Sequence, residues 1–596
     1  MTESIGIAVP AVRLAVRAST LARVLQWLAL LTILLGAARI VATYPAISIT
    51  FDEPAHIAAG MQLLDRDKFT YERLHPPLAR VAAALGPYIA GYRSQNGLDM
   101  WSEGRRLFYT AGHPDYVMLT LARLGILPFF LASLVLVWLW TDRYVGAVEG
   151  ALAVIALGNL PLLLAHSGLA TTDVPFAATF TAAFFAFLLW LDHPSTVRGL
   201  LLGATVALAV CTKLSALLFL PAACGPVLAH RWLCSGRDWH PGHLFASWRG
   251  LLAGSAAFLL VVWVVYGCNA DPLYGIVNLA GGIGELLTLA DRGQPSFFLG
   301  KLDLDGDWAF FPVLILVRSP IPFLIAVGIG AVVLIRRYRW DWRQMAPLLG
   351  AAGLIASVLP STVNLGLRHL LPAFPLLAIV AAIGLGRLLA PPLLPRRAVL
   401  AGLLLVWQTA EAAVATPDYL AYFNQLALGE PEQIVTDSDL DWGHDVDRLA
   451  AALKQHRIDR LHLALHTSAD LRLHGLPSFE VLFPGRPAAG WVAISEQMHA
   501  FYCAGYRWLD AYEPVARVGA SIRLYYVPGP APPADPDVIR RFNWNWYAPL
   551  PCSPETISRR NSLPASNEAL RSHARPYPDN PAQIPAVRAG MRSLDP

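Results

Sequence analysis

The amino-acid sequence predicts a polytopic α-helical membrane protein with a small α/β domain toward its C-terminal end. Hydrophobic residues make up 55% of the 596 residues and charged residues only 15%. Because soluble proteins usually carry about 25% charged residues, most of this chain is expected to lie in lipid. The net charge of +4 and the lack of a Lys/Arg-rich run exclude a nucleic-acid-binding surface.

Apolar runs of membrane length recur along the first 416 residues. We expect about eleven transmembrane helices, at residues 21–42, 116–140, 146–165, 173–191, 199–212, 214–230, 250–267, 309–335, 345–360, 369–390 and 398–416. The first run is interpreted as a retained span, because it is long and no small-x-small cleavage site follows it.

Arginines in alternate loops predict the orientation of the spans. These residues are Arg231, Arg237, Arg249, Arg336, Arg337, Arg339, Arg343, Arg396 and Arg397. Because cytoplasmic loops carry an excess of Lys and Arg, we expect a multi-pass inner or plasma membrane protein with a cytoplasmic N-terminus. An odd number of spans then places the C-terminal domain outside the cytoplasm.

The chain divides into three regions, at 1–416, 417–527 and 528–596. The first is the transmembrane region. The second begins with the helical pattern "DVDRLAAALKQHR" and continues with the strand-like "RLHLALH", "GWVAIS" and "SIRLYYV". The third is rich in Pro, Ser, Asn and Arg, so we expect a partly disordered tail. Cys503 and Cys552 are both expected outside, where a disulfide is possible but is not determined by the sequence.

Two carboxylates follow the first span in "TFDEPAHIAAGMQLLD", which predicts a helix along the membrane interface. One interpretation of Asp52 and Glu53 is structural: Thr50 caps the helix and Glu53 is its capping-box partner. The other is chemical. Adjacent carboxylates near the membrane raise each other's pKa, and desolvation raises it further, which suits a proton acceptor.

Two further outer segments carry polar residues beside apolar helical patterns. A second interfacial helix is predicted in "HPPLARVAAALGPYI", where His75 is either a turn residue or a ligand-binding residue. Asp173 opens the fourth span in "SGLATTDVPFAATF". Capping of that span by Thr172 or Asp173 is the structural alternative to a role in a site.

Cations are expected at the same outer leaflet. Arg368 and His369 stand at the outer end of the tenth span, where a guanidinium can hold a phosphate through two hydrogen bonds, or can simply extend toward water. Lys213 and Arg318 lie in apolar runs, where a charge costs about 2.5–3.5 kcal/mol on insertion scales. Each therefore needs a partner or a wet cavity, and packing against other helices satisfies that need equally well.

No protein-only metal site is predicted, although Asp52 and His56 are four residues apart on one helix. A divalent cation held by Asp52, Asp173 and a substrate phosphate stays open but is not favoured. The sequence has no P-loop, Rossmann fingerprint or nucleophile elbow, so no nucleotide cofactor is expected and the energy source must lie in the substrate.

Taken in order, these motifs resemble those of the bacterial GT-C glycosyltransferases related to protein O-mannosyltransferases and to the lipid A aminoarabinose transferase. The resemblance runs from the first span to about residue 527. It rests on "FDEPAH", "HPPLARV", "LATTDVP", "TKLSALL", "GKLDLDGDWAFFPV" with "LVRSPIP", and "NLGLRHLLP". The segments "YLAYFNQLALGE" and "DSDLDWGHDVDRLA" are similar to a subgroup with an outer C-terminal domain. Asp439, His444 and Arg318 depart from the residues that are common in relatives, and the resemblance assigns no role to "DWGHD".

The resemblance implies an inverting transfer of a monosaccharide from a polyprenyl-phosphate carrier to an acceptor hydroxyl on a lipid, a glycan or a protein. Asp52 is then the expected general base, with Glu53 assisting and Asp173 orienting the acceptor or the base. The carrier phosphate is expected at His75, Lys213, Arg318, Arg368 and His369. The alternative is a transporter of a lipid-linked sugar, which the expected lack of paired interrupted helices disfavours.

Overall fold

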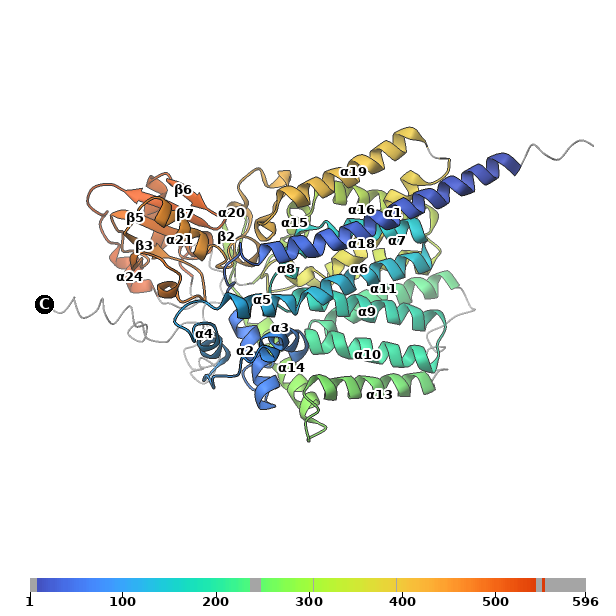
Figure 1. Ribbon diagram of the computed structural model, residues 1–596, viewed down its shortest axis with the longest axis horizontal. Helices are drawn as coiled ribbons and strands as arrows, with labels where there is room; N and C mark the ends of the chain where they lie inside the picture. The colour runs from blue at the N-terminus through green and yellow to red at the C-terminus, as the bar shows by residue number, and fades with distance from the viewer. Residues whose placement is uncertain (1–7, 236–247, 304, 393, 543–548, 553–596) are drawn as a thin grey trace, which may run out of the picture.

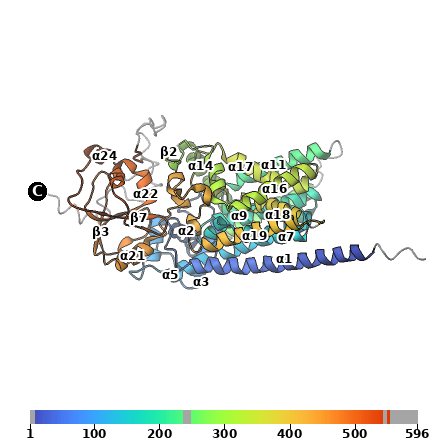
Figure 2. The same ribbon diagram turned by 90° about the horizontal axis from the view of Figure 1, so that it is seen from above.

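A computed structural model describes residues 8–235, 248–303, 305–392, 394–542 and 549–552. Long helices run side by side along the longest axis of the molecule, and an α/β domain caps one end of the bundle (Figures 1 and 2). The first outer loop lies at that same end. Arg237 of the expected cytoplasmic loop lies outside the described residues.

Each of the eleven apolar runs is helical. The helices are α1 (Ala8–Thr43), α5 (Tyr116–Leu124), α6 (Leu127–Tyr144), α7 (Ala147–Gly158), α8 (Pro161–Ser167), α9 (Asp173–Asp192), α10 (Thr196–Thr212), α11 (Ala216–Ser235), α13 (Trp248–Val265), α15 (Phe310–Arg318), α16 (Ile321–Arg337), α17 (Trp342–Val358), α18 (Ala373–Leu389) and α19 (Pro395–Val414). By length and composition, 6 described helices can cross a membrane alone, or up to 8 if each bent pair is one span. The count of eleven therefore stays a prediction.

Two of the expected spans are interrupted, which corrects the expectation of continuous helices. Helices α7 and α8 meet at 66°, and α15 and α16 meet at 114°. Proline explains both breaks, since Pro161 opens α8 and Pro320 directly precedes α16. A proline ring clashes with the helical conformation of the residue before it and removes a backbone donor. The expected span at 309–335 is thus two helices, and Arg318 ends the first.

Helix α9 is at the centre of the bundle. Its side chains are almost all buried from Asp173 to Leu191, because apolar and aromatic residues cover every side of it. Phe184 contacts Trp140 of α6 with ring centroids 5.4 Å apart. The N-terminus of this buried helix places Asp173 at the end of the bundle that faces the α/β domain.

Helices α10 and α13 approach closely through small residues. A Cβ atom on Gly203 would lie 1.9 Å from the carbonyl oxygen of Gly254, and one on Gly199 would lie 2.1 Å from that of Gly250. Both helices therefore carry a Gly-x-x-x-Gly pattern at the contact, a common means of close helix packing in membranes.

Short helices and a hairpin cover the end of the bundle near the α/β domain. They are α2 (Glu53–Arg66), α3 (Pro77–Ile89), α4 (Met100–Phe108), α14 (Tyr274–Arg292), β1 (Ser296–Phe298) and β2 (Lys301–Asp303). Helices α2 and α3 correspond to the two expected outer helices. Helix α2 is buried on all sides from Glu53 to Leu63, not only on its apolar face, because its polar residues find partners inside the protein.

The C-terminal domain is a five-stranded mixed sheet in the order β4-β3-β5-β7-β6. Strands β4, β3 and β5 are parallel to one another, and β7 runs antiparallel to both of its neighbours, β5 and β6. The elements are α20 (Pro431–Ile434), α21 (Val446–Gln455), β3 (Arg460–Ala464), β4 (Ser478–Val481), β5 (Gly490–Ser495), α22 (Glu496–Phe501), α23 (Cys503–Tyr506), β6 (Ala516–Val518), β7 (Ile522–Val527) and α24 (Pro536–Arg541). Strands β3, β5 and β7 fall in the three stretches expected to be strands, and apolar cores form on both faces of the sheet.

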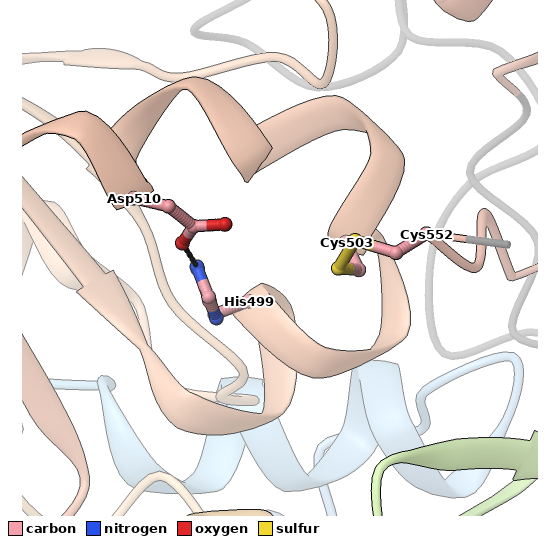
Figure 3. Close-up of a disulfide and its surroundings, with 4 residues drawn as sticks. All are labelled: His499, Cys503, Asp510 and Cys552. Carbon is pink, nitrogen blue, oxygen red and sulfur yellow. Dashed lines mark ion pairs between the residues drawn. A yellow bond between two sulfur atoms is a disulfide. The ribbon is translucent and has the colours of Figure 1, made fainter.

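The domain continues past the expected boundary at residue 527. Helix α24 packs Val538 into one core, and Leu550 is buried there as well. A disulfide joins Cys503 of α23 to Cys552, close to an ion pair between His499 and Asp510 (Figure 3). The rest of the expected tail, residues 553–596, lies outside the described residues.

Candidate active site between the helical bundle and the C-terminal domain

The candidate site lies where loops from the bundle meet the C-terminal domain. Arg368, on the short 3-10 helix η1 (Leu367–Leu370), is at its centre. Its Nη1 atom donates to Asp52 Oδ2 at 3.0 Å and lies 3.8 Å from Asp173 Oδ2. Burial alone would lower the pKa of Arg368, but Asp52 and Asp173 outweigh it and raise that pKa. Residues from three distant parts of the sequence thus share one charged cluster.

Asp173 contacts two cations. Lys213 Nζ, just past the end of α10, donates to Asp173 Oδ1 at 2.8 Å. The capping interpretation finds no support here, since α9 begins without a side-chain cap hydrogen bond. Lys213 has found the partner that a charge in an apolar run requires. The carboxylate of Asp173 is almost fully buried, with 1% of its side chain exposed.

Asp52 is the more open carboxylate of the cluster. It occupies the N-cap position of α2 without capping it through its side chain. A quarter of that side chain, 25%, is exposed, so a ligand can approach it. The backbone beside it is fixed, because Phe51 donates to the carbonyl of Trp442 at 3.0 Å and accepts from the Ser468 hydroxyl at 2.8 Å.

The side chain of Glu53 points into the protein, away from the partly exposed carboxylate of Asp52. Arg123 donates to both of its carboxylate oxygens at 2.8 Å, and the backbone amides of Ala170 and Thr50 complete four hydrogen bonds. The expectation that its pKa is raised is wrong. Burial acts in that direction, but Arg123 and the backbone donors lower the pKa below its ordinary value. Glu53 therefore fixes the Asp52 turn to Ala170, three residues before Asp173.

His75 belongs to a second charged group beside α2 and α3. Its Nδ1 atom lies 3.0 Å from Glu72, which also pairs with Arg80. Arg80 donates to His56 at 3.3 Å, and the rings of His56 and His75 are 5.4 Å apart. Burial lowers the pKa of His56 well below its ordinary value, and Arg80 and His75 lower it further.

His369 and Arg318 differ in their relation to the cluster. Burial lowers the pKa of His369 well below its ordinary value, and the charges of Lys213 and Arg368 lower it further. Arg318 instead extends toward the C-terminal segments: it lies 3.4 Å from Asp439, donates to the Leu420 carbonyl at 2.8 Å and is buried. Its role as a phosphate ligand stays a prediction.

The segment Thr436–Asp445 was not expected to form part of the site. The ring of Trp442 lies 4.1 Å below the guanidinium carbon of Arg368, a cation–π contact. Asp439 accepts from the Leu367 amide at 3.0 Å, and the carbonyl of His444 accepts from Ser48 at 3.0 Å. The segment therefore braces the Arg368 loop against the Asp52 loop.

The sequence also carries signals for other residues of the site. Arg123 lies in an apolar run, as do Lys213 and Arg318, so the same argument predicts a buried partner for it. His166 follows the apolar "PLLLA", and both of its buried ring nitrogens lack a hydrogen bond among the described residues. Trp442 carried no signal, because its importance depends on the fold.

The described residues contain no group of three or more His, Cys, Asp or Glu side chains arranged to hold a metal ion. Asp52 and Asp173 are the carboxylates that a divalent cation would require, and Arg368 lies beside both of them. The cluster thus combines a partly open carboxylate with two fixed cations. Such an arrangement can accept a proton and bind an anion side by side.

The fold and the site define a polytopic α-helical membrane protein with a charged site at one end of its helices. Residues 120–266 match the family model of dolichyl-phosphate-mannose-protein mannosyltransferases. The resemblance predicted from the motifs is confirmed over this segment, which includes Asp173 and Lys213 but neither Asp52 nor Arg368. No curated protein sequence matches the chain.

Several solved structures are similar at low sequence identity. The crystal structure of ArnT from Cupriavidus metallidurans bound to undecaprenyl phosphate has 13% identity and a TM-score of 0.47, covering 85% of this chain and 99% of that one. The apo structure of the same protein has 14% identity and a TM-score of 0.46, covering 84% and 97%. The oligosaccharyltransferase AglB from Archaeoglobus fulgidus, in complex with an inhibitory peptide and a dolichol-phosphate, has 11% identity and a TM-score of 0.42, covering 80% and 70%.

Proposed function

We propose that the protein is an inverting glycosyltransferase that moves a monosaccharide from a polyprenyl-phosphate carrier to an acceptor hydroxyl at the outer face of the membrane. The observation that carries the proposal is the cluster of Asp52, Arg368, Asp173 and Lys213. It provides a proton acceptor and an anion site within a few ångströms, at the end of the apolar helices. The match of residues 120–266 to the mannosyltransferase family supports the same class of reaction.

The reaction assigned to this cluster is a single displacement. The acceptor oxygen attacks the anomeric carbon, and its proton moves to a carboxylate oxygen of Asp52. The bond from the anomeric carbon to the phosphate oxygen breaks, and the phosphate leaves with the electron pair. Asp173 holds Lys213 and, through Arg368, orients the base.

The two cations stabilise the step because the charge on the phosphate grows during it. The donor is a phosphodiester with one negative charge, and the departing monoester gains a second. Arg368 and Lys213 therefore bind the transition state more strongly than the donor, which lowers the barrier. Within the part of the chain that the structure describes, Arg368 donates to protein atoms from Nε and Nη1, so Nη2 can donate to a phosphate oxygen.

Two features support transfer on the outer face. The arginine-bearing loops gather at the end of the bundle opposite the site, where Arg231 stacks on Trp342 and Arg343 pairs with Asp192. Such loops are typical of the cytoplasmic side. The disulfide between Cys503 and Cys552 belongs to the domain at the other end, and disulfides persist in oxidising compartments.

A transporter of a lipid-linked sugar is the second candidate, and the two bent helix pairs favour it more than the sequence did. Interrupted helices are frequent at the binding sites of transporters. A partly exposed carboxylate at the membrane surface, held by Arg368, is more useful for proton transfer than for transport. The two functions differ in what becomes of the sugar.

The experiment uses the purified protein in liposomes with a labelled polyprenyl-phosphate sugar and an acceptor extract. We expect labelled product and released lipid phosphate, and loss of about 10²–10⁴ in rate for Asp52→Asn. The control is Asp67→Asn, which removes an exposed charge from the same loop at a left-handed position that asparagine tolerates. If the natural protein and Asp52→Asn both translocate the sugar-lipid and neither transfers the sugar, the protein is instead a transporter.

A further inference from the structure

A third carboxylate accompanies Asp52 and Asp173 near Arg368. Asp437 lies on the 3-10 helix η4 (Asp437–Asp439) of the segment from the C-terminal domain, and its charge acts on Arg368 together with those of Asp52 and Asp173. The next residue fixes its place, since the Ser438 hydroxyl donates to the Leu365 carbonyl at 2.9 Å, three residues before Arg368. The segment that carries Asp437 is thus held against the loop that carries Arg368.

The three carboxylates are not equally stabilised. Asp52 pairs directly with Arg368, and Asp173 pairs directly with Lys213. The hydrogen bond to the carboxylate of Asp437 comes instead from a neutral donor, the amide of Ser438. Asp437 is therefore the carboxylate whose ionised form gains least from its surroundings.

The backbone holds Asp437 in this place at some expense. Its φ angle is 54°, in the left-handed region that residues other than glycine seldom adopt. The backbone amide of Asp437 donates to the side chain of Gln497 on α22. The backbone carbonyl of Asp437 accepts from the amides of Leu440 and Asp441. Strained positions of this kind are concentrated at functional sites.

The charged side chains around Arg368 carry an excess of negative charge, which opposes the binding of a phosphate. Asp52, Asp173 and Asp437 carry three negative charges against the two positive charges of Arg368 and Lys213. The neighbouring pairs Arg318–Asp439 and Arg80–Glu72 are each balanced. A phosphodiester adds one more negative charge to a cluster that already has one in excess. The repulsion falls most heavily on Asp437, which has no ion pair among the described residues.

We propose that Asp437 is a functional residue of the site that binds a proton when the carrier phosphate binds. Its neutral form removes one negative charge from the cluster and allows Arg368 and Lys213 to receive the phosphate. This inference rests on the proposed function, because it assumes that the ligand is a lipid phosphodiester. It also gives the C-terminal domain a part in donor binding.

The pKa of Asp437 agrees with this role. Burial raises the pKa to about 7, Arg368 acts against the rise, and Asp52 and Asp439 add to it. The charged groups that face Asp437 are thus Arg368 on η1, Asp52 before α2 and Asp439 on η4, while α22 contributes the neutral Gln497. A further negative charge raises the pKa again, so the complex holds the proton at a higher pH than the free protein does.

The test measures the affinity of the purified protein for a short polyprenyl methyl phosphodiester by calorimetric titration at several pH values. This probe carries one constant negative charge and cannot transfer a sugar. Asp437→Asn and Asp437→Gly remove the charge and both tolerate a left-handed position. At about pH 6 we expect the variants to bind like the natural protein, and at about pH 8 about tenfold more tightly, since one pH unit above a pKa of about 7 is worth about tenfold.

Asp441→Asn is the matched control. Burial also raises the pKa of Asp441 to about 7, but the groups that act on it are Ser495, Gln497, Gly443 and Glu496, and Arg368 is not among them. It should keep the pH dependence of the natural protein. Variants of Asp437 that bind equally or more weakly at high pH overturn the inference while leaving the proposed function intact. Failure of the natural protein to bind the probe at any pH overturns both.

Discussion

Arg368 is the residue on which the candidate site depends. Its planar guanidinium lies on the ring of Trp442 and donates to Asp52, so its orientation is fixed before any ligand arrives. A lysine provides a point charge without this planar geometry. Pre-orientation matters for a phosphate, because the hydrogen bond from Nη2 forms only if this nitrogen already faces the anion.

Replacement of Trp442 by leucine should weaken donor binding. A cation–π contact is worth about 0.5–2 kcal/mol, so we expect KM for the donor to rise about 2- to 30-fold with a smaller change in kcat. Trp442→Phe should retain part of the effect. Trp340→Leu is the control, because Trp340 also lies beside an arginine, Arg339, but is exposed and remote from the site. Equal effects of the two leucine variants would contradict the role of Trp442.

Replacement of Glu53 by glutamine should destabilise the fold. It leaves Arg123 buried without its counter-charge, which typically costs about 3–5 kcal/mol. Because the pKa of Glu53 is lowered in the folded protein, its stabilisation is present above the ordinary value of 4.5 and is lost as the pH falls below it. The measurement is the midpoint of thermal unfolding in detergent at neutral and acidic pH.

Glu480→Gln is the control for this effect, since its ion pair with Arg460 is exposed to solvent and contributes little. We expect its unfolding midpoint to match that of the natural protein. A Glu53→Gln protein that is equally stable at neutral pH would show that the buried pair does not hold the Asp52 turn in place.

Several residues of the site could be predicted from the sequence, and others could not. Asp52, Asp173 and Arg368 stood out as charges at the outer ends of apolar runs, and Lys213 as a charge within one. The structure brings all four together. Glu53 stood out for the same reason, but the pattern could not show that Arg123 pairs with it. The contributions of the C-terminal segment were unpredictable, since they depend on contacts between residues far apart in the chain.

At the scale of secondary-structure elements, the breaks in the bundle place polar groups beside the site. Helix α8 ends just before Ala170, whose amide binds Glu53, and α15 ends at Arg318, which pairs with Asp439. If either helix continued without a break, Ala170 or Arg318 would lie beyond the site along the helix axis. The apolar runs predicted where helices lie along the sequence. Mean hydropathy carries no information on the direction in which a helix runs, so the two bends were not predicted.

The contact between α10 and α13 gives a prediction at the same scale. Gly203→Ala should lower the thermal unfolding midpoint, because the added Cβ would lie 1.9 Å from a carbonyl of α13 and force the helices apart. Alanine otherwise favours a helix over glycine. Gly328→Ala on α16 is the control, since a Cβ there meets nothing within 4 Å. A Gly203→Ala protein as stable as Gly328→Ala would contradict this packing.

At the scale of the whole molecule, the C-terminal domain is part of the site and not an appendage. Its His474 contacts Tyr109 of the first outer loop at 2.8 Å, and its Asp447 accepts from the Tyr116 hydroxyl, at the start of α5, at 2.7 Å. The strand patterns predicted the domain, but its docking on the bundle had no signature in the sequence.

The proposed orientation can be tested with two of the cysteines. Cys268 is exposed and follows α13 at the end of the site, where Tyr266 contacts Phe69 of the first outer loop. Cys234 lies near the opposite end, within reach of the Arg339 carbonyl. In intact cells, a membrane-impermeant maleimide should label a protein that keeps only Cys268 and the disulfide, but not one that keeps only Cys234 and the disulfide. The reverse pattern would invert the topology.

The central claim is that Asp52 takes the acceptor proton beside a phosphate bound by Arg368. The most direct test measures donor binding and single-turnover transfer on the same preparation of Asp52→Asn. We expect the variant still to bind the polyprenyl-phosphate sugar, while the rate of transfer falls by about 10²–10⁴. A variant that transfers the sugar at the natural rate, or that fails only because it no longer binds the donor, would contradict it.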